Sequence, residues 1–259
     1  MKRLVVLEKV YGPYRPEEFT PAFLSLLSGL AVDVRVIGTA GRGWLVLELS
    51  GEDEAVAIKL LEEEVGLAPE ELGKLAKFST VRGRITTLAE GGVLVDVGVL
   101  RPVNVDALVG LSRLRAQLAD GMGVELQEIS SLFCLIENLP LEVKILEEPT
   151  GPGPLSAELS EGQVRLFEEW VASGLDRIIV AGASHHAVKR AISATGLYDK
   201  VVDFYRLGLL EHCITLKLGV KLGEAIRALR RRLRKAVVRA FRPLEIVKAF
   251  PGRYGGLRL

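Results

Sequence analysis

Residues 91–98, near the centre of the chain, read Gly91-Gly92-Val93-Leu94-Val95-Asp96-Val97-Gly98. It follows Phe78–Leu88, another run rich in threonine, valine and isoleucine, across the turn Glu90-Gly91-Gly92. Two strand-forming runs joined by Gly-Gly predict a β-hairpin. The middle of the chain is therefore expected to be antiparallel β structure.

Further strands are expected on the C-terminal side of this hairpin. A helix is predicted over Leu111–Leu118, and short strands over Val124–Ile129, Phe133–Glu137 and Leu141–Leu146. Five strands with one intervening helix predict a small Greek-key barrel of the OB type. We assign this barrel to residues 76–148.

On the N-terminal side of the hairpin, residues 1–75 alternate between strand and helix patterns. The expected order is β-α-β-β-α, with strands over Lys2–Val10, Val32–Val36 and Trp44–Leu49 and helices over Glu17–Leu27 and Glu54–Val65. Helices packed on a small sheet are the natural layer arrangement for this order. The sequence predicts a ferredoxin-like α+β domain here.

Proline and glycine mark the boundary after the barrel. Residues 148–154 hold three prolines and two glycines in seven positions, which cannot continue a helix or a strand. We therefore predict a Pro/Gly linker over residues 149–156, with an exposed hinge at 149–154.

Residues 157–259 are expected to form an α/β domain with a basic helix and a tail. Ser160 is a candidate N-cap for a helix over Gly162–Ser173. The pattern then predicts, in order, a strand over Asp176–Gly182, helices over Ser184–Ala194 and Tyr198–Leu207, a strand over His212–Leu218 and a helix over Leu222–Arg234. The whole chain is thus predicted to be an α+β protein of three domains.

The composition is that of a globular protein, and it favours a thermophilic, cytoplasmic one. Of 259 residues, 49% are hydrophobic and 26% charged, and no apolar run reaches the roughly 18 residues that cross a bilayer. The first residues run into Glu8 too early for a signal peptide, so we expect a cytoplasmic protein without membrane contact. Only two asparagines and three glutamines are present, which is typical of thermophilic proteins.

The charge is distributed very unevenly. Residues 217–242 contain ten basic side chains and one acidic one, and residues 243–259 carry a further net charge of +2. Because the whole chain is at +1, residues 1–216 have a net charge of −10. On the predicted helix, the i, i+3, i+4, i+7 spacing places Arg227, Arg230, Arg231 and Arg234 on one face. Arginine suits phosphate because its planar group donates two parallel hydrogen bonds. We therefore expect this face, with Lys217 and Lys221, to bind RNA phosphates; the alternative is a face paired with the protein's own acidic residues.

A second candidate site is the loop that contains Gly182, Ser184, His185 and His186, between a predicted buried strand and a helix. Open α/β sheets bind ligands at such positions, so the loop is a candidate ligand site. The alternative is an N-cap by Ser184 followed by two exposed histidines. Adjacent histidines, and the pair His212-Cys213, have poor geometry for a shared metal ion, so no metal, cofactor or catalytic residue is assigned. The two cysteines, Cys134 and Cys213, are too few to form a framework of disulfides. A single disulfide between them remains an alternative, because the cytosol of hyperthermophiles permits disulfides.

The barrel region resembles S1-type RNA-binding domains. The resemblance rests on Val81–Ile85, Gly91–Gly98 and Leu108–Ser112, and it implies an RNA-binding barrel. Val93 or Leu94 stands where S1 barrels usually carry an aromatic residue. Around the same hairpin, Arg82, Arg84 and Arg101 are candidate phosphate contacts.

The whole chain also resembles an archaeal family defined by a domain of unknown function, number 2110. The resemblance rests on Val93–Gly98 with Pro102, on Asn138–Leu141 and on Glu211–Gly219. It implies an archaeal cytosolic protein and supplies no activity.

The function expected from these patterns is RNA binding without catalysis, in a ribosome-, tRNA- or transcription-related role. One rival is an enzyme that acts on a nucleotide or nucleic acid at the Gly182–His186 loop. The other is an assembly module whose basic end docks an acidic protein. The sequence does not indicate the oligomeric state.

Overall fold

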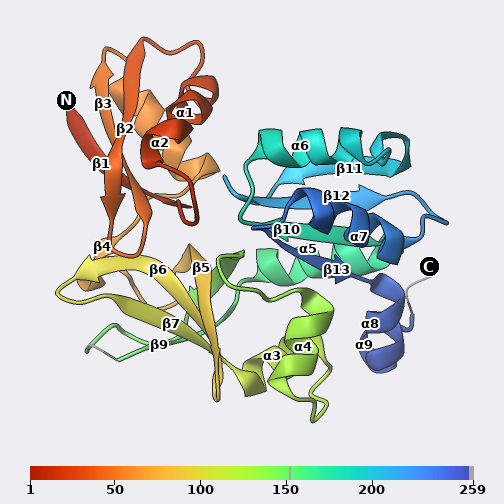
Figure 1. The fold of residues 1–259 in the computed structure, drawn as a ribbon. Helices are drawn as coiled ribbons and strands as arrows, with labels where there is room; N and C mark the ends of the chain where they lie inside the picture. The colour runs from red at the N-terminus through yellow and green to blue at the C-terminus, as the bar shows by residue number, and fades with distance from the viewer. Residues whose placement is uncertain (152, 257–259) are drawn as a thin grey trace.

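The computed structural model describes residues 1–151 and 153–256. In these residues the chain folds around three β-sheets, which follow one another along the sequence (Figure 1). Each sheet contributes to a hydrophobic core, and the central core extends onto one face of the C-terminal sheet. The α+β class is confirmed.

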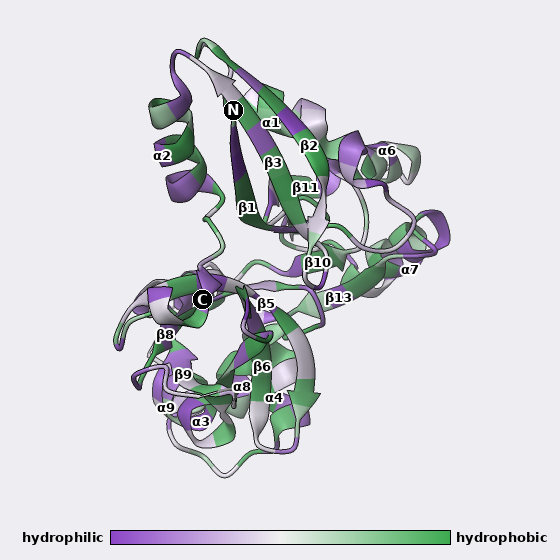
Figure 2. Ribbon diagram, turned by 90° about the vertical axis from the view of Figure 1, so that its left-hand side faces the viewer, coloured by the Kyte–Doolittle hydropathy of each residue, from purple (hydrophilic) through white to green (hydrophobic). Residues whose placement is uncertain are grey.

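The N-terminal unit has the predicted order of elements. It contains β1 (Lys2–Lys9), a 3₁₀ turn (Pro16–Phe19), α1 (Thr20–Leu26), β2 (Val32–Ala40), β3 (Trp44–Gly51) and α2 (Glu54–Glu64). The strands pair antiparallel in the order β1-β3-β2. Hydropathy alternates along β2 in Figure 2 because successive side chains point to opposite faces and only one face is buried.

The central unit is a closed barrel of five strands, as predicted. The strands are β5 (Thr80–Ala89), β6 (Gly92–Arg101), β7 (Val105–Gly110), β8 (Pro140–Ile145) and β9 (Leu155–Leu159). The barrel closes because β6 pairs with both β5 and β7, β9 pairs with both β7 and β8, and β8 pairs with β5. A short strand, β4 (Glu70–Glu71), adds to β6, and a 3₁₀ turn follows at Leu72–Lys74.

Two of the strands predicted for this barrel are wrong. After α3 (Leu111–Leu118), which is confirmed, the chain forms a second helix, α4 (Leu126–Phe133), where a strand was predicted over Val124–Ile129. The strand predicted over Phe133–Glu137 is also absent, because that range begins with the end of α4 and continues without strand structure. The buried residues of α4 are Leu126, Ile129, Ser130 and Phe133. Their spacing matches a helical period, which a short apolar run does not distinguish from a strand.

The strand that completes the barrel lies beyond the proline- and glycine-rich segment. That segment joins β8 to β9, and β9 pairs with both β7 and β8. The segment predicted as an interdomain linker over 149–156 therefore connects two strands of the same barrel. Pro152, which belongs to the predicted linker, lies outside the described residues. The barrel extends to Leu159, eleven residues past the predicted boundary at 148.

The C-terminal unit begins with α5 (Glu161–Ala172), which Ser160 caps as predicted by accepting from the Gln163 N–H. The elements that follow are β10 (Arg177–Ala181), α6 (His185–Ala194), a 3₁₀ turn (Tyr198–Lys200), β11 (Val201–Arg206), β12 (Glu211–Leu216), α7 (Leu222–Arg232), β13 (Val237–Phe241), α8 (Pro243–Ala249) and α9 (Pro251–Tyr254). From β10 to β13 this is the β-α-β-β-α-β order of the ferredoxin-like motif. The strand order is β11-β12-β10-β13, with antiparallel neighbours throughout.

The helix predicted over Tyr198–Leu207 is wrong, because β11 occupies most of that range. Phe204 packs with the core under α6 and α7, whereas Tyr205 packs with the central core. Neighbouring side chains thus enter cores on opposite faces of the sheet, which only an extended strand permits.

The two faces of the C-terminal sheet are both covered. One face packs against α6 and α7. From the other face, Ile179, Cys213 and Phe241 enter the central core, together with Phe167 and Trp170 of α5. The C-terminal unit is thereby fixed against the barrel, with α7 on the outside.

Candidate nucleic-acid interface

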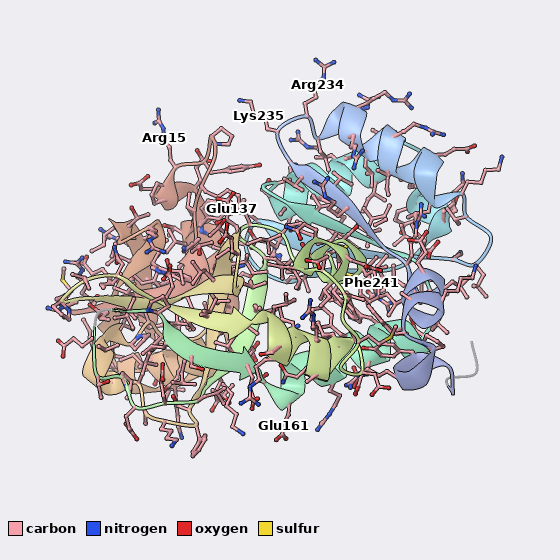
Figure 3. The ribbon with its side chains drawn as sticks, turned by 90° about the horizontal axis from the view of Figure 1, so that it is seen from below. Arg15, Glu137, Glu161, Arg234, Lys235 and Phe241 are labelled. Carbon is pink, nitrogen blue, oxygen red and sulfur yellow. The ribbon has the colours of Figure 1, made fainter. Side chains whose placement is uncertain are left out.

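The amphipathic helix α7 places its arginines in solvent. Its apolar residues Leu222, Ala225, Ile226 and Leu229 are buried against the sheet. The opposite side and the turn that follows form a surface that we call the arginine surface, made of the exposed residues Arg227, Arg230, Arg231, Arg232, Arg234 and Lys235. Figure 3 shows Arg234 and Lys235 pointing away from the body of the protein.

The arginine surface has no acidic partners within residues 1–151 and 153–256. None of its six cations forms an ion pair there, and the single carboxylate of α7, Glu224, lies 3.4 Å from Lys221 instead. Arg230 donates to the Val238 carbonyl at 2.8 Å. The alternative of a face paired with the protein's own acids is therefore not realised in the described residues.

The position of Arg234 corrects the predicted helix. The helix α7 ends at Arg232 with Leu233 as its C-cap, so Arg234 lies in the turn beyond the helix. Three of the arginines lie in the last turn of α7, where the helix dipole stabilises cations. Lys217 is exposed in the segment between β12 and α7.

The three candidate arginines of the barrel differ in their burial and in their partners. The guanidinium of Arg84 is buried and donates to the carboxylates of Glu8 and Glu211, so the predicted phosphate contact is wrong for this residue. Arg101 is exposed and lies 3.2 Å from the Glu71 carboxylate. Arg82 is half-buried and donates to the Glu64 carbonyl at 2.9 Å.

The buried ion pairs of Arg84 join all three units. Glu8 comes from β1, Arg84 from β5 and Glu211 from β12, and Tyr11 also donates its hydroxyl to Glu211. Burial raises the pKa of Glu211, and Arg84 opposes this shift. The sequence could not reveal this network, because its members are far apart along the chain.

A second buried pair lies beside the first. The ammonium of Lys9 is 2.6 Å from the Asp96 carboxylate and 4.5 Å from the centre of the Trp44 ring. Burial lowers the pKa of Lys9, and Asp96 partly offsets that shift. Asp96 also accepts from the Trp44 indole at 3.1 Å and from the Gly98 N–H at 3.0 Å. Asp96 therefore has a structural role at this position.

The Gly182–His186 loop is ordered by contacts within the protein. Ser184 caps α6 by accepting from the Ala187 N–H at 3.3 Å, and its own N–H donates to the Tyr14 hydroxyl at 3.0 Å. His185 stacks on Phe204, with ring centres 4.7 Å apart, and His186 is exposed. Because the sheet is antiparallel, it lacks the parallel-strand crevice on which the ligand-site prediction depended.

The structure offers no group of metal ligands in the described residues, since no three histidine, cysteine, aspartate or glutamate side chains gather there.

Cys134 and Cys213 are buried free thiols, and burial raises their pKa values to about 12 and about 11. In the part of the chain that the structure describes, no helix has the length and apolar character to cross a membrane.

Two hollows lie at the junctions between units. The larger, of about 640 Å³, is lined by residues of all three units, among them Arg82, Arg206, Glu64 and Glu142, so its charges do not select a ligand. The smaller, of about 390 Å³, is lined by Tyr11, Gly12, Pro13, Gly182 and Lys235. Only the smaller hollow adjoins the arginine surface, through Lys235.

Comparison with protein families covers most of the chain. Residues 3–71 match the DUF2110 N-terminal domain, residues 76–171 the DUF2110 central domain and residues 175–223 the DUF2110 C-terminal domain. The chain belongs to the DUF2110 family. The central DUF2110 match includes β9, as the barrel pairing requires, and extends into α5. The arginine surface begins at Arg227, beyond the C-terminal match, and none of the curated proteins compared matches the chain.

Proposed function

We propose that this DUF2110 protein binds RNA through the phosphates, without catalysis, and that the arginine surface is the binding surface. The observation that carries the proposal is that six exposed cations have no carboxylate partner in the described residues. Clustered guanidinium groups repel one another, and phosphate oxygens would neutralise them while accepting paired hydrogen bonds.

The packing of the C-terminal sheet favours this surface over the sheet itself. RNA-recognition domains with a four-stranded sheet stack bases on aromatic residues of an open sheet face. Here Phe241 points from that face into the central core, against Phe167 and Trp170. Because this sheet face is covered, the exposed side of α7 is the better candidate for the binding surface. Binding through its arginines predicts an affinity that depends mainly on phosphate contacts and has little sequence preference.

The proposal includes the finer assignments that the sequence suggests. We infer an archaeal, thermophilic and cytoplasmic protein with a ferredoxin-like N-terminal unit and an S1-like barrel. In this protein the barrel acts mainly as a scaffold, because Arg84 is buried and Arg101 is paired.

The test is the salt dependence of RNA binding. A fluorescently labelled single-stranded RNA is titrated at several salt concentrations, and the slope of log affinity against log salt is measured by anisotropy. Each phosphate contact contributes about −0.7 to the slope for a single strand. Replacing Arg227, Arg230, Arg231 and Arg234 by glutamine removes charge and keeps helix propensity. The variant should lose most of its affinity, and its slope should become shallower by about two to three units.

A matched control removes the same number of charges elsewhere. Arg3, Arg35, Arg113 and Arg165 are exposed and lie on other elements, and their glutamine variant should bind RNA with nearly the slope of the parent protein. Circular dichroism establishes that both variants are folded. If the α7 variant keeps the affinity and slope of the parent protein, the RNA proposal is wrong, and docking of an acidic protein becomes the better explanation of the arginine surface.

A further inference from the structure

The hollow beside the arginine surface has the components of a nucleotide-binding pocket. Its volume of about 390 Å³ lies at the lower end of the range for small-ligand pockets. It is lined by an aromatic ring, Tyr11, by Pro13, and by one cation, Lys235. Lys235 is also a member of the arginine surface, so the hollow adjoins that surface.

The Tyr11 ring is held in place by both neighbouring units. Its hydroxyl donates to Glu211, which in turn accepts from the buried Arg84. Three residues further on, the Tyr14 hydroxyl accepts from the Ser184 N–H at 3.0 Å. These bonds tie the loop after β1 to the start of α6, so the ring is oriented before any ligand arrives.

Gly182 keeps the floor of the hollow free of a side chain. Its φ of +88° is a conformation that other residues rarely adopt, and a Cβ atom there would lie 3.5 Å from the Tyr11 ring. The backbone of Lys235 and Ala236 bounds the same space at 3.7 Å.

Cations flank the hollow from two units. Figure 3 shows Arg15, Lys235 and Arg234 pointing outward along the same edge of the molecule. Arg15 follows Pro13 on the loop after β1, and Arg234 precedes Lys235 in the turn after α7. Phosphates on both sides of a bound nucleotide would thus meet positive charge.

We propose that the nucleic acid bound by this protein is single-stranded, and that one unpaired nucleotide sits in this hollow, with its base against the Tyr11 ring and its phosphate at Lys235. The inference rests on the proposed function and deepens it. A duplex cannot make this contact without extruding a base, which costs unstacking and unpairing energy. A single strand offers its bases freely, and stacking on an aromatic side chain tolerates any base.

The test compares a single-stranded RNA with a blunt duplex of the same sequence, using Tyr11→Leu and Tyr11→Phe variants. Tyr11→Leu removes the ring and should weaken single-strand binding about tenfold, with duplex binding and the salt slope unchanged. Tyr11→Phe loses only the bond to Glu211 and should retain the preference for the single strand. Tyr198, which is 72% exposed on another part of the C-terminal unit, provides the matched control Tyr198→Leu, expected to bind as the parent protein does.

A photocrosslinking experiment on the unmodified protein tests the same contact without relying on the folding of a variant. A single-stranded RNA containing 4-thiouridine should crosslink to the peptides that hold Tyr11 and Lys235. Crosslinks confined to α7, equal affinity for both RNA forms, or equal losses in the Leu and Phe variants would overturn the inference. The proposed function fails separately, when the quadruple arginine variant binds as tightly as the parent protein.

Discussion

The Arg84 guanidinium of barrel strand β5 donates to the Glu211 carboxylate of β12, and each side chain is only 1% exposed. Glu8 of β1 accepts from the same guanidinium, so one buried cation connects the three units. Groups from different units, such as Tyr11 and Lys235, therefore keep a fixed relation to one another. The proposed nucleotide contact depends on this arrangement, because Tyr11 and Lys235 come from separate units.

Replacing Arg84 by methionine should destabilise the protein by about 3–5 kcal/mol. The substitution keeps an unbranched side chain but leaves the carboxylates of Glu8 and Glu211 buried without a cation. Urea unfolding at neutral pH measures the change. Arg101→Met is the control, since Arg101 is exposed at the surface, and it should change the free energy of unfolding by no more than about 0.5 kcal/mol. An Arg84 variant as stable as the control would show that the buried pairs do not hold the units together.

His212 should make the protein sensitive to acid. Burial lowers the pKa of His212 to about 3, and His185 and Arg206 add to the shift. The unfolded chain binds a proton at His212 below about pH 6.5, whereas the folded chain does not until about pH 3, so stability falls as the pH falls through this window. At pH 4 the loss from this one residue is about 3 kcal/mol relative to neutral pH.

The variant His212→Phe should remove that loss, because phenylalanine can stack on Phe204 and His185 and does not titrate. The measurement is the free energy of unfolding at pH 7 and pH 4 for the variant and the parent protein. His186→Phe, at an exposed position, is the control and should follow the parent profile. Identical pH dependence in the His212 variant and the parent protein would contradict the lowered pKa.

Cleavage in the loop between β8 and β9 should not separate the chain into two independent halves. The strands on either side of the loop pair with each other, and β9 also pairs with β7. A protease that cuts near Glu148 should therefore give two fragments that co-elute on size exclusion and separate only in denaturant. If the fragments separate under native conditions, the loop is a boundary between two independent domains, as the sequence predicted.

Patterns of neighbouring residues in the sequence correctly predicted the elements whose buried face follows from their own residues. The β5–β6 hairpin follows from the Glu90-Gly91-Gly92 turn, and α7 from apolar residues at helical spacing. The predictions were wrong for segments in which a short apolar run is compatible with both a strand and a helix. Residues 126–133 and 201–206 are of this kind, and in each case packing against a distant element decides the outcome.

The arginines show the same division between sequence and structure. The local sequence places Arg227, Arg230 and Arg231 on the polar side of an amphipathic helix, because the 3.6-residue period puts the four apolar residues of α7 on the opposite side. The burial of Arg84 depends on tertiary packing, because its partners Glu8 and Glu211 lie 76 and 127 residues away along the chain. A charge enters a protein interior only when opposite charges meet it there, and that meeting depends on the packing of three units.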